Sequence, residues 1–179
     1  MRRLNWFLMP IVALVALGTM SAAKTTQNPG LTPQQRLEKE VRHELIMLPY
    51  YGVFDNLEFK VEGGKVTLFG QVARPTLKSD AGGVVKHIEG VESVDNKIEV
   101  LPLSPNDDRI RLAEYRAIFR TDGLLYYAVR AVPPIHIIVK NGNVDLVGVV
   151  SKQMDKNLAG IAANSVPGVF SVKNDLRVE

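Results

Sequence analysis

The chain contains no cysteine among its 179 residues. This absence excludes a disulfide framework, a thiolate zinc site, a cysteine nucleophile and a lipid-modified N-terminal cysteine. A chain without thiols also avoids mispaired disulfides in an oxidising compartment, which is consistent with export.

The chain also lacks an apolar run long enough for a comfortable membrane span. A short basic start is followed by a mostly apolar run to Gly18, and Ser21 and Ala23 are small residues at cleavage-site positions. This pattern predicts a secretory signal peptide at residues 1–23, cleaved near Ala23. An uncleaved N-terminal membrane anchor is the alternative, although the run of about 13 apolar residues is short against the roughly 20 that a spanning helix needs.

A strong excess of one charge is missing as well. The whole chain carries a formal charge of +3, and removal of Arg2 and Arg3 with the predicted signal peptide leaves 20 basic and 19 acidic side chains, a net charge of +1. A nearly neutral, exported protein does not have the basic footprint of a nucleic-acid-binding protein. Nucleic acid is therefore not predicted as a partner.

Motifs of catalysis, cofactor binding and metal binding are absent from the sequence. There is no nucleophile elbow, phosphate-binding loop or dinucleotide fingerprint. His43, His87 and His136 are far apart in the sequence, and none has a second ligand at metal-binding spacing. We expect them at the surface, His136 as an outward-facing strand residue. Asp107 and Asp108 are expected at a helix start, where the helix dipole favours acidic residues. The sequence thus predicts no enzyme, no cofactor and no metal site.

One stretch of the chain occurs twice. Residues 61–72 (VEGGKVTLFGQV) and 139–150 (VKNGNVDLVGVV) align at an offset of 78 positions, and the offset continues without a gap to Leu101 and Glu179. The matched positions keep apolar residues and glycines in step, as in the pairs Val66/Val144, Leu68/Leu146, Gly82/Gly160, Gly90/Gly168 and Val94/Val172. A match of this length predicts a tandem repeat of one small module.

Each copy has the pattern of a helix, a two-stranded hairpin, a second helix and a final strand. In the first copy, Thr32 and Gln35 form a capping-box signature, and an apolar stripe at helical spacing follows. Alternating apolar and charged residues predict a strand before a tight Gly63-Gly64 turn. The predicted fold class is α+β, with tandem αββαβ modules, each a three-stranded mixed sheet with two helices on one face.

The predicted domain boundaries follow from the repeat and from the proline-containing segment between its copies. They are a signal peptide at 1–23, a flexible leader at 24–31, a first domain at 32–101, a linker at 102–105 and a second domain at 106–179. The linker is short and stiff, so the two modules are expected to lie close together.

Repeated glycines and asparagines are expected to have structural roles. These residues are Gly64, Gly70, Gly142, Gly148, Asn96 and Asn174. We expect a helix to approach Gly70 and Gly148 closely on the inward face of a strand. The asparagines share the register of buried valines and are expected to bond to the backbone.

Two repeated patterns resemble those of the BON-domain family. The first is Gly-x-Val-x-Leu-x-Gly-x-Val at 64–72 and 142–150, and the second is Gly-Val-x-Ser-Val-x-Asn at 90–96 and 168–174. The resemblance implies a non-enzymatic, phospholipid-binding protein that supports outer-membrane integrity, similar to the osmotically inducible periplasmic proteins with two such domains. Some two-domain members are lipoproteins, and because this chain lacks the required cysteine, a soluble periplasmic form is implied.

The segment from 109 to 130 differs most between the copies and is the candidate functional region. It holds five arginines against two acidic residues, interleaved with aromatic and apolar side chains. Arginine beside tyrosine suits an interface with anionic lipid headgroups. The candidate lipid-binding residues are Arg109, Arg111, Tyr115, Arg116, Phe119, Arg120, Tyr126, Tyr127 and Arg130. Two alternatives stay open: part of this set is core and solvated surface, or the modules bind an envelope protein partner, or oligomerise, through exposed sheet edges.

Overall fold

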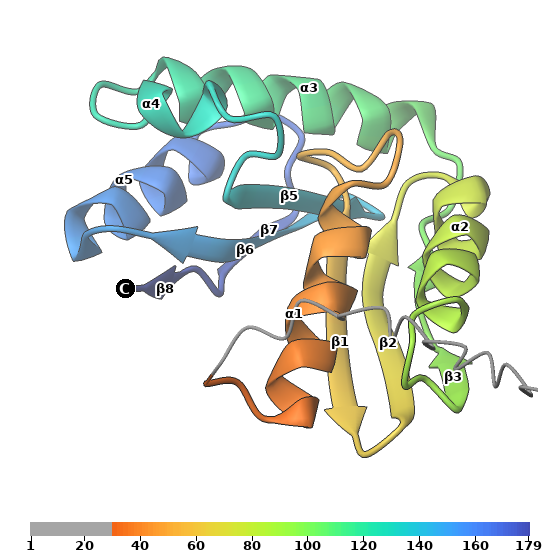
Figure 1. Ribbon diagram of the computed structural model, residues 1–179. Helices are drawn as coiled ribbons and strands as arrows, with labels where there is room; N and C mark the ends of the chain where they lie inside the picture. Colours follow the sequence, from red (N-terminus) through yellow and green to blue (C-terminus); the bar gives the residue numbers. More distant parts are fainter. Residues whose placement is uncertain (1–29) are drawn as a thin grey trace, which may run out of the picture. The chain divides into compact units, whose positions relative to one another are not determined.

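The computed structural model describes residues 30–179, which form two α+β modules in tandem (Figure 1). The first module consists of α1 (Pro33–Ile46), β1 (Asn56–Glu62), β2 (Lys65–Val72), α2 (Pro75–Lys86), β3 (Ser93–Asn96) and β4 (Glu99–Val100). The second consists of α3 (Pro105–Arg120), α4 (Leu125–Ala128), β5 (Ile135–Lys140), β6 (Asn143–Val150), α5 (Gln153–Asn164), β7 (Ser171–Asn174) and β8 (Arg177–Val178). The predicted fold class is confirmed. The predicted signal peptide, and all but the last two residues of the predicted leader, lie outside the described residues.

The first helix of each module begins at a side-chain cap. Thr32 accepts from the amide of Gln35, whose side chain accepts from the amide of Thr32, so the predicted capping box is present. Ser104 caps α3 in a similar way, by accepting from the amide of Asp107. No helix within residues 30–179 combines the length and the apolarity that a membrane crossing requires.

Each sheet is built around the second strand of its hairpin. β1 pairs antiparallel with β2, and β3 and β4 both pair parallel with β2. β5 pairs antiparallel with β6, and β7 and β8 both pair parallel with β6. The single third strand expected in each module is therefore interrupted, and both of its pieces follow the same central strand. In each module the outer strand of the hairpin, β1 or β5, forms one edge of the sheet.

The asparagines at this interruption bond to the backbone on two sides. Asn96 donates to the carbonyl oxygen of Lys78 in α2 (2.8 Å) and accepts from the amide of Ile98 (3.2 Å). Asn174 makes the corresponding bonds to Lys156 and Leu176. A side chain at Gly82 or Gly160 would crowd these amide groups, so each glycine lets the helix approach the interrupted strand.

Gly70 and Gly148 are required by the neighbouring strand, and the expectation that a helix approaches them is wrong. Both residues have a positive φ, +104° and +120°. A Cβ atom would collide with the carbonyl oxygen of Asn56 at Gly70 and with that of Pro134 at Gly148. Each glycine therefore stands where the strand bends against the start of its hairpin partner.

The two hairpin turns differ in backbone geometry. Asn141 and Gly142 both have positive φ, as a two-residue hairpin turn of this kind requires, whereas in the first turn only Gly63 does. At Gly64 a Cβ atom would instead collide with the side chain of Glu92.

Each module has its own apolar core between the helices and one face of the sheet. The first core includes Val41, Leu68 and Val85, and the second includes Ile118, Leu146 and Ala163. Val53 and Phe54, from the loop between α1 and β1, pack against the second core. The loop of the first module therefore holds the two modules together.

The contact between this loop and β5 also buries His136, so the expectation that His136 faces outward is wrong. Its imidazole ring stacks on Tyr51, with ring centroids 5.6 Å apart, and Nδ1 lies 3.3 Å from the carbonyl oxygen of Gly52. Burial lowers the pKa of His136. Sequence periodicity could not reveal this environment, because the covering residues belong to the other module.

Candidate membrane-contact surface

The structure divides the nine candidate lipid-binding residues into a buried and an exposed group. Arg111, Phe119 and Tyr127 are buried, and Tyr115 is half-buried between Phe54 and Phe119. The exposed residues are Arg109, Arg116, Arg120, Tyr126 and Arg130. The buried residues support the fold, and the exposed residues form the candidate binding surface.

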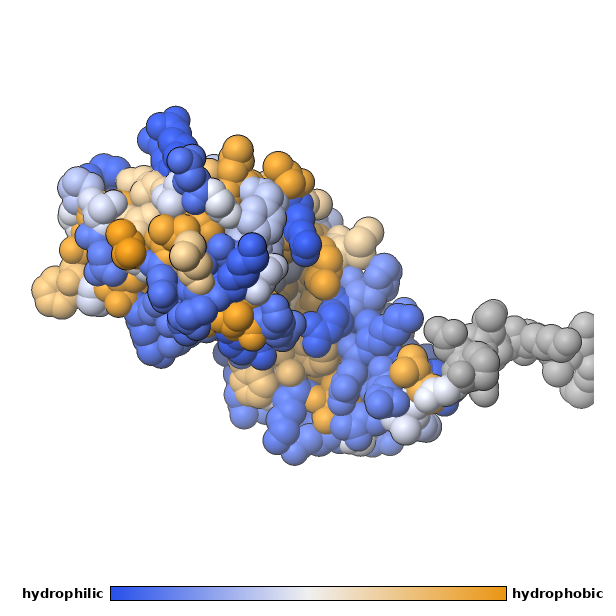
Figure 2. Space-filling model, turned by 90° about the vertical axis from the view of Figure 1, so that its left-hand side faces the viewer, coloured by the Kyte–Doolittle hydropathy of each residue, from blue (hydrophilic) through white to orange (hydrophobic). Residues whose placement is uncertain are grey.

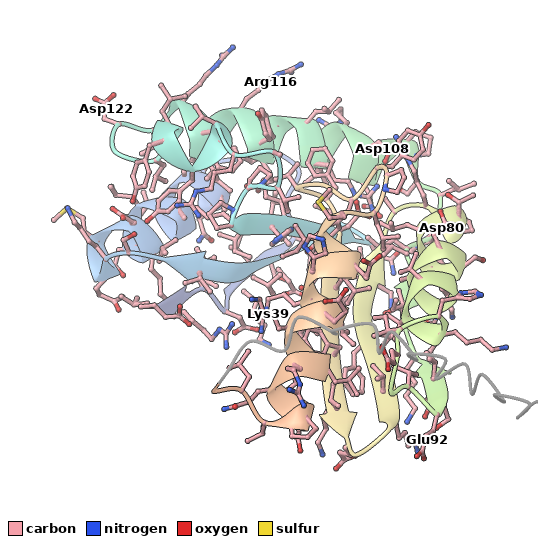
Figure 3. All side chains as sticks on the ribbon, viewed as in Figure 1. Lys39, Asp80, Glu92, Asp108, Arg116 and Asp122 are labelled. Carbon is pink, nitrogen blue, oxygen red and sulfur yellow. The ribbon has the colours of Figure 1, made fainter. Side chains whose placement is uncertain are left out.

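The exposed arginines of α3 form one stripe along the helix. Positions 109, 112, 116 and 120 fall on one side because an α-helix has 3.6 residues per turn. Leu112, in this stripe, is 49% exposed. Arg116 points away from the body of the molecule (Figure 3). None of these arginines makes an ion pair with any residue between 30 and 179.

Exposed apolar side chains follow the arginines on α4 and directly after it. Leu125 is 64% exposed, Tyr126 46% and Val129 78%, and Arg130 comes next. We use the name α3–α4 surface for these residues together: Arg109, Leu112, Arg116, Arg120, Leu125, Tyr126, Val129 and Arg130. Figure 2 faces the end of the second module at which α4 and α5 lie, and hydrophobic residues there are interspersed among hydrophilic ones.

Two tyrosines fix α4 to the second module. The hydroxyl groups of Tyr126 and Tyr127 both donate to Oδ2 of Asp155, at 2.9 and 2.7 Å, and Tyr127 also accepts from the amide of Ser151. Asp155 lies in the first turn of α5. The apolar residues of α4 are therefore attached to α5, and the hydroxyl groups of both candidate tyrosines are already used within the fold.

The start of α3 is fixed in the same manner by buried charges. Asp107 accepts from the amides of Asn141 and Gly142, each at 2.9 Å. Arg111 pairs with Asp108 and donates to the carbonyl oxygen of Val139 (2.7 Å). The explanation of Asp107 by the helix dipole alone is therefore incomplete, because its carboxylate binds the turn of the β5–β6 hairpin.

Glu114 is a buried carboxyl group that sequence reasoning missed. It is 0% exposed, and neither carboxyl oxygen has a hydrogen-bond partner among the described residues. Burial raises its pKa to about 8, so the side chain is mostly protonated at neutral pH. Its spacing of four residues from Ile110 and Ile118, both buried, was the available signal. No cluster of three or more acidic, histidine or cysteine side chains that could hold a metal occurs within residues 30–179.

The two α+β modules with their duplicated hairpins define a class of proteins built from a tandem repeat of one small domain. Comparison with known proteins identifies the same class. The BON domain family matches residues 34–102 and 122–179, and the chain belongs to this family. Proteins of this family are not enzymes, which confirms the prediction of a non-enzymatic protein. The second match begins after α3, although α3 packs against β5 and α5 in the structure.

Two curated relatives and one solved structure can be named. The chain is 31% identical over 132 residues to osmotically-inducible protein Y of Escherichia coli, covering 69% of this chain and 62% of that protein, which is less than two thirds of its length. It is 29% identical over 178 residues to outer membrane lipoprotein DolP of Haemophilus influenzae, covering 93% and 87%. CdsD, a structural protein of the type III secretion system of Chlamydia trachomatis, matches over 80% of this chain and 92% of the solved chain at 14% identity, with a low TM-score of 0.32.

Proposed function

We propose that the protein is a soluble periplasmic protein that binds anionic phospholipid through the α3–α4 surface and thereby supports the outer membrane or tolerance of osmotic stress. The observation that carries the proposal is the set of four exposed arginines beside exposed Leu125 and Val129. Relatives named for the outer membrane and for osmotic induction support the cellular setting.

The chemistry of this surface suits the boundary between water and lipid. Guanidinium groups without an internal ion pair are available to phosphate oxygens, and each basic residue near an anionic membrane contributes about 1 kcal/mol of attraction. Apolar side chains that are more than half exposed gain from transfer into the headgroup region. Because α4 is fixed to α5 through Asp155, little order has to be created when the surface binds.

The test is co-sedimentation of the purified protein with vesicles of an anionic phospholipid and, in parallel, of a zwitterionic one. Reversal of Arg116 and Arg120 to glutamate changes the charge of the surface by four units, so we expect affinity for anionic vesicles to fall by at least tenfold. Lys39→Glu with Lys86→Glu is the matched control, because both lysines are exposed and lie on helices of the first module.

The control variant should bind anionic vesicles within about twofold of the wild-type protein, after allowance for its changed net charge. Equal loss in both double variants would mean that net charge, and not the α3–α4 surface, governs binding. Undiminished binding of the variant with glutamate at 116 and 120 would refute the proposed site.

A further inference from the structure

The contact between the two modules consists of a loop that covers a sheet edge. The carbonyl oxygen of Val53 accepts from the amide of Ile137 (2.7 Å), so the loop satisfies an outward-pointing group of the edge strand β5. Beside it, His136 lies against Gly52. The contact is thus made by a covering loop of the first module and the edge strand of the second.

The salt bridge between the modules belongs to the same contact. Lys140, at the end of β5, pairs with Glu99 in β4. Here too the second module supplies its edge strand, and the first module supplies the other partner. Three pairs of positions therefore describe the polar part of the contact: 52 with 136, 53 with 137, and 99 with 140.

The duplication gives each of these positions an equivalent in the other module. β1 and β5 have the same register, because Leu57 pairs with Gly70 as Ile135 pairs with Gly148, 78 positions later. The corresponding edge of the first module is therefore made by positions 58, 59 and 62 of β1. Within residues 30–179 no backbone carbonyl group outside the sheet accepts from the amide of Phe59.

The positions of the second module that correspond to the covering loop and to Glu99 are also uncovered. By the 78-residue offset alone, counted back from β5, Arg130 and Ala131 correspond to Gly52 and Val53, and Arg177 corresponds to Glu99. All three residues are exposed. The first module thus has an edge strand that is uncovered at Phe59, and the second module has a loop that covers no edge within residues 30–179.

The charges of the unused positions are complementary. The β1 edge presents Glu58 and Glu62, both exposed, where β5 has His136 and Lys140. The second module presents Arg130 in its loop and Arg177 in β8. Both equivalent pairs, 58 with 130 and 62 with 177, therefore join an acid to an arginine, and one side supplies both acids.

We propose that the second module of one copy docks through Arg130, Ala131 and Arg177 onto the β1 edge of the first module of another copy, in a head-to-tail contact that repeats the contact within the chain. Such a contact is heterologous, so it leads to a ring or to a linear chain of copies. Charges along β1, including the Lys60–Glu62 ion pair, discourage pairing with unrelated strand edges and favour a partner with two arginines at the right separation.

The absence of cysteine allows a direct crosslinking test on the full protein. Glu58→Cys and Arg130→Cys are made as separate variants, mixed, and treated with a short bismaleimide. We expect the yield of crosslinked heterodimer in this mixture to be at least about fivefold above that of a control mixture of Glu58→Cys with Arg116→Cys, since position 116 is also exposed but lies on α3. Equal yields in the two mixtures would overturn the proposal.

A charge exchange at the second pair provides an independent measurement by sedimentation. Glu62→Arg or Arg177→Glu alone should weaken self-association by about threefold to fivefold, and the double variant should restore it, because the pair is then present with its charges exchanged. Failure of the double variant to recover, or no concentration-dependent association in the wild-type protein up to about millimolar, the weak end of specific binding, would contradict the head-to-tail contact. Neither residue lies on the α3–α4 surface, so vesicle binding is expected to be unchanged, and the two proposals can fail separately.

Discussion

Glu114 should make the protein lose stability as the pH rises, and its replacement by glutamine should remove that loss. The carboxyl group is 0% exposed and has no hydrogen-bond partner for either oxygen among the described residues. Its pKa is about 8 in the folded protein against 4.5 for the ordinary side chain. Below pH 4.5 both states are protonated, whereas between about pH 4.5 and 8 the unfolded chain ionises and the folded protein does not.

The size of the effect follows from the distance between the pH and the ordinary pKa. At pH 7 that distance is 7 minus 4.5, and at 1.36 kcal/mol per pH unit it corresponds to about 3 kcal/mol. The cost disappears in Glu114→Gln, which cannot ionise. The free energy of unfolding of the variant should therefore gain about 3 kcal/mol relative to the wild-type protein between pH 4.5 and 7, a large part of the 5–15 kcal/mol typical of a domain.

Urea unfolding followed by far-ultraviolet circular dichroism, at half-unit steps from pH 4.5 to 8, measures this difference. Other titrating groups, including buried His136, are common to both proteins and cancel in it. Glu40→Gln, at an exposed position of α1, is the control and should show no comparable trend. Parallel stability curves for the wild-type protein and Glu114→Gln across this range would refute the interpretation, because they would mean that Glu114 ionises in the folded protein as readily as in the unfolded chain.

Three further predictions test other parts of the structure. Asp107→Ala should lower the free energy of unfolding by about 2–3 kcal/mol, since two amides of the hairpin turn lose a charged acceptor, and urea unfolding would show it. Gly148→Ala should cost at least about 2 kcal/mol because of its positive φ and its contact with the neighbouring strand, whereas Gly83→Ala, with nothing near its Cβ position, should be neutral or stabilising by up to about 1 kcal/mol. Leu125→Ser with Val129→Ser should weaken vesicle binding about tenfold at low and high salt alike, without changing stability, because burial of apolar surface is not screened by salt. Co-sedimentation at two salt concentrations measures this loss of affinity. Equal affinities of the double variant and the wild-type protein would mean that the interaction is purely electrostatic.

The fold was accessible from the sequence because its determinants are local. The capping box at Thr32, the turn at Asn141-Gly142 and the alternation in the strands each depend on a few neighbouring residues. The interruption of the third strand was not predicted, because it arises when the side chain of Asn96 bonds both to α2 and to its own strand. That arrangement depends on residues 18 positions apart in the chain.

The candidate site was only partly accessible for a related reason. Composition located the arginines and aromatics of the segment from 109 to 130, but it could not separate Arg111 and Tyr127, which bond within the fold, from Arg116 and Leu125, which are exposed. Charged residues in a core are uncommon, so a sequence reader places them at the surface. Glu114 is a second case of the same error, and its helical spacing from buried isoleucines was the only contrary signal.

Identity and difference between the two modules report on separate properties. The identical residues Gly70 and Gly148 meet the same backbone constraint in each copy, which follows from the fold and says nothing about partners. Differences at equivalent positions of the edge strands bear on the proposed contact between copies. Where β5 has the histidine that the first module buries, β1 has Glu58, an exposed acid that would suit a cation better than the ring of Tyr51. An edge that is closed within the chain and an equivalent edge that is open therefore require different residues, and the chain has them.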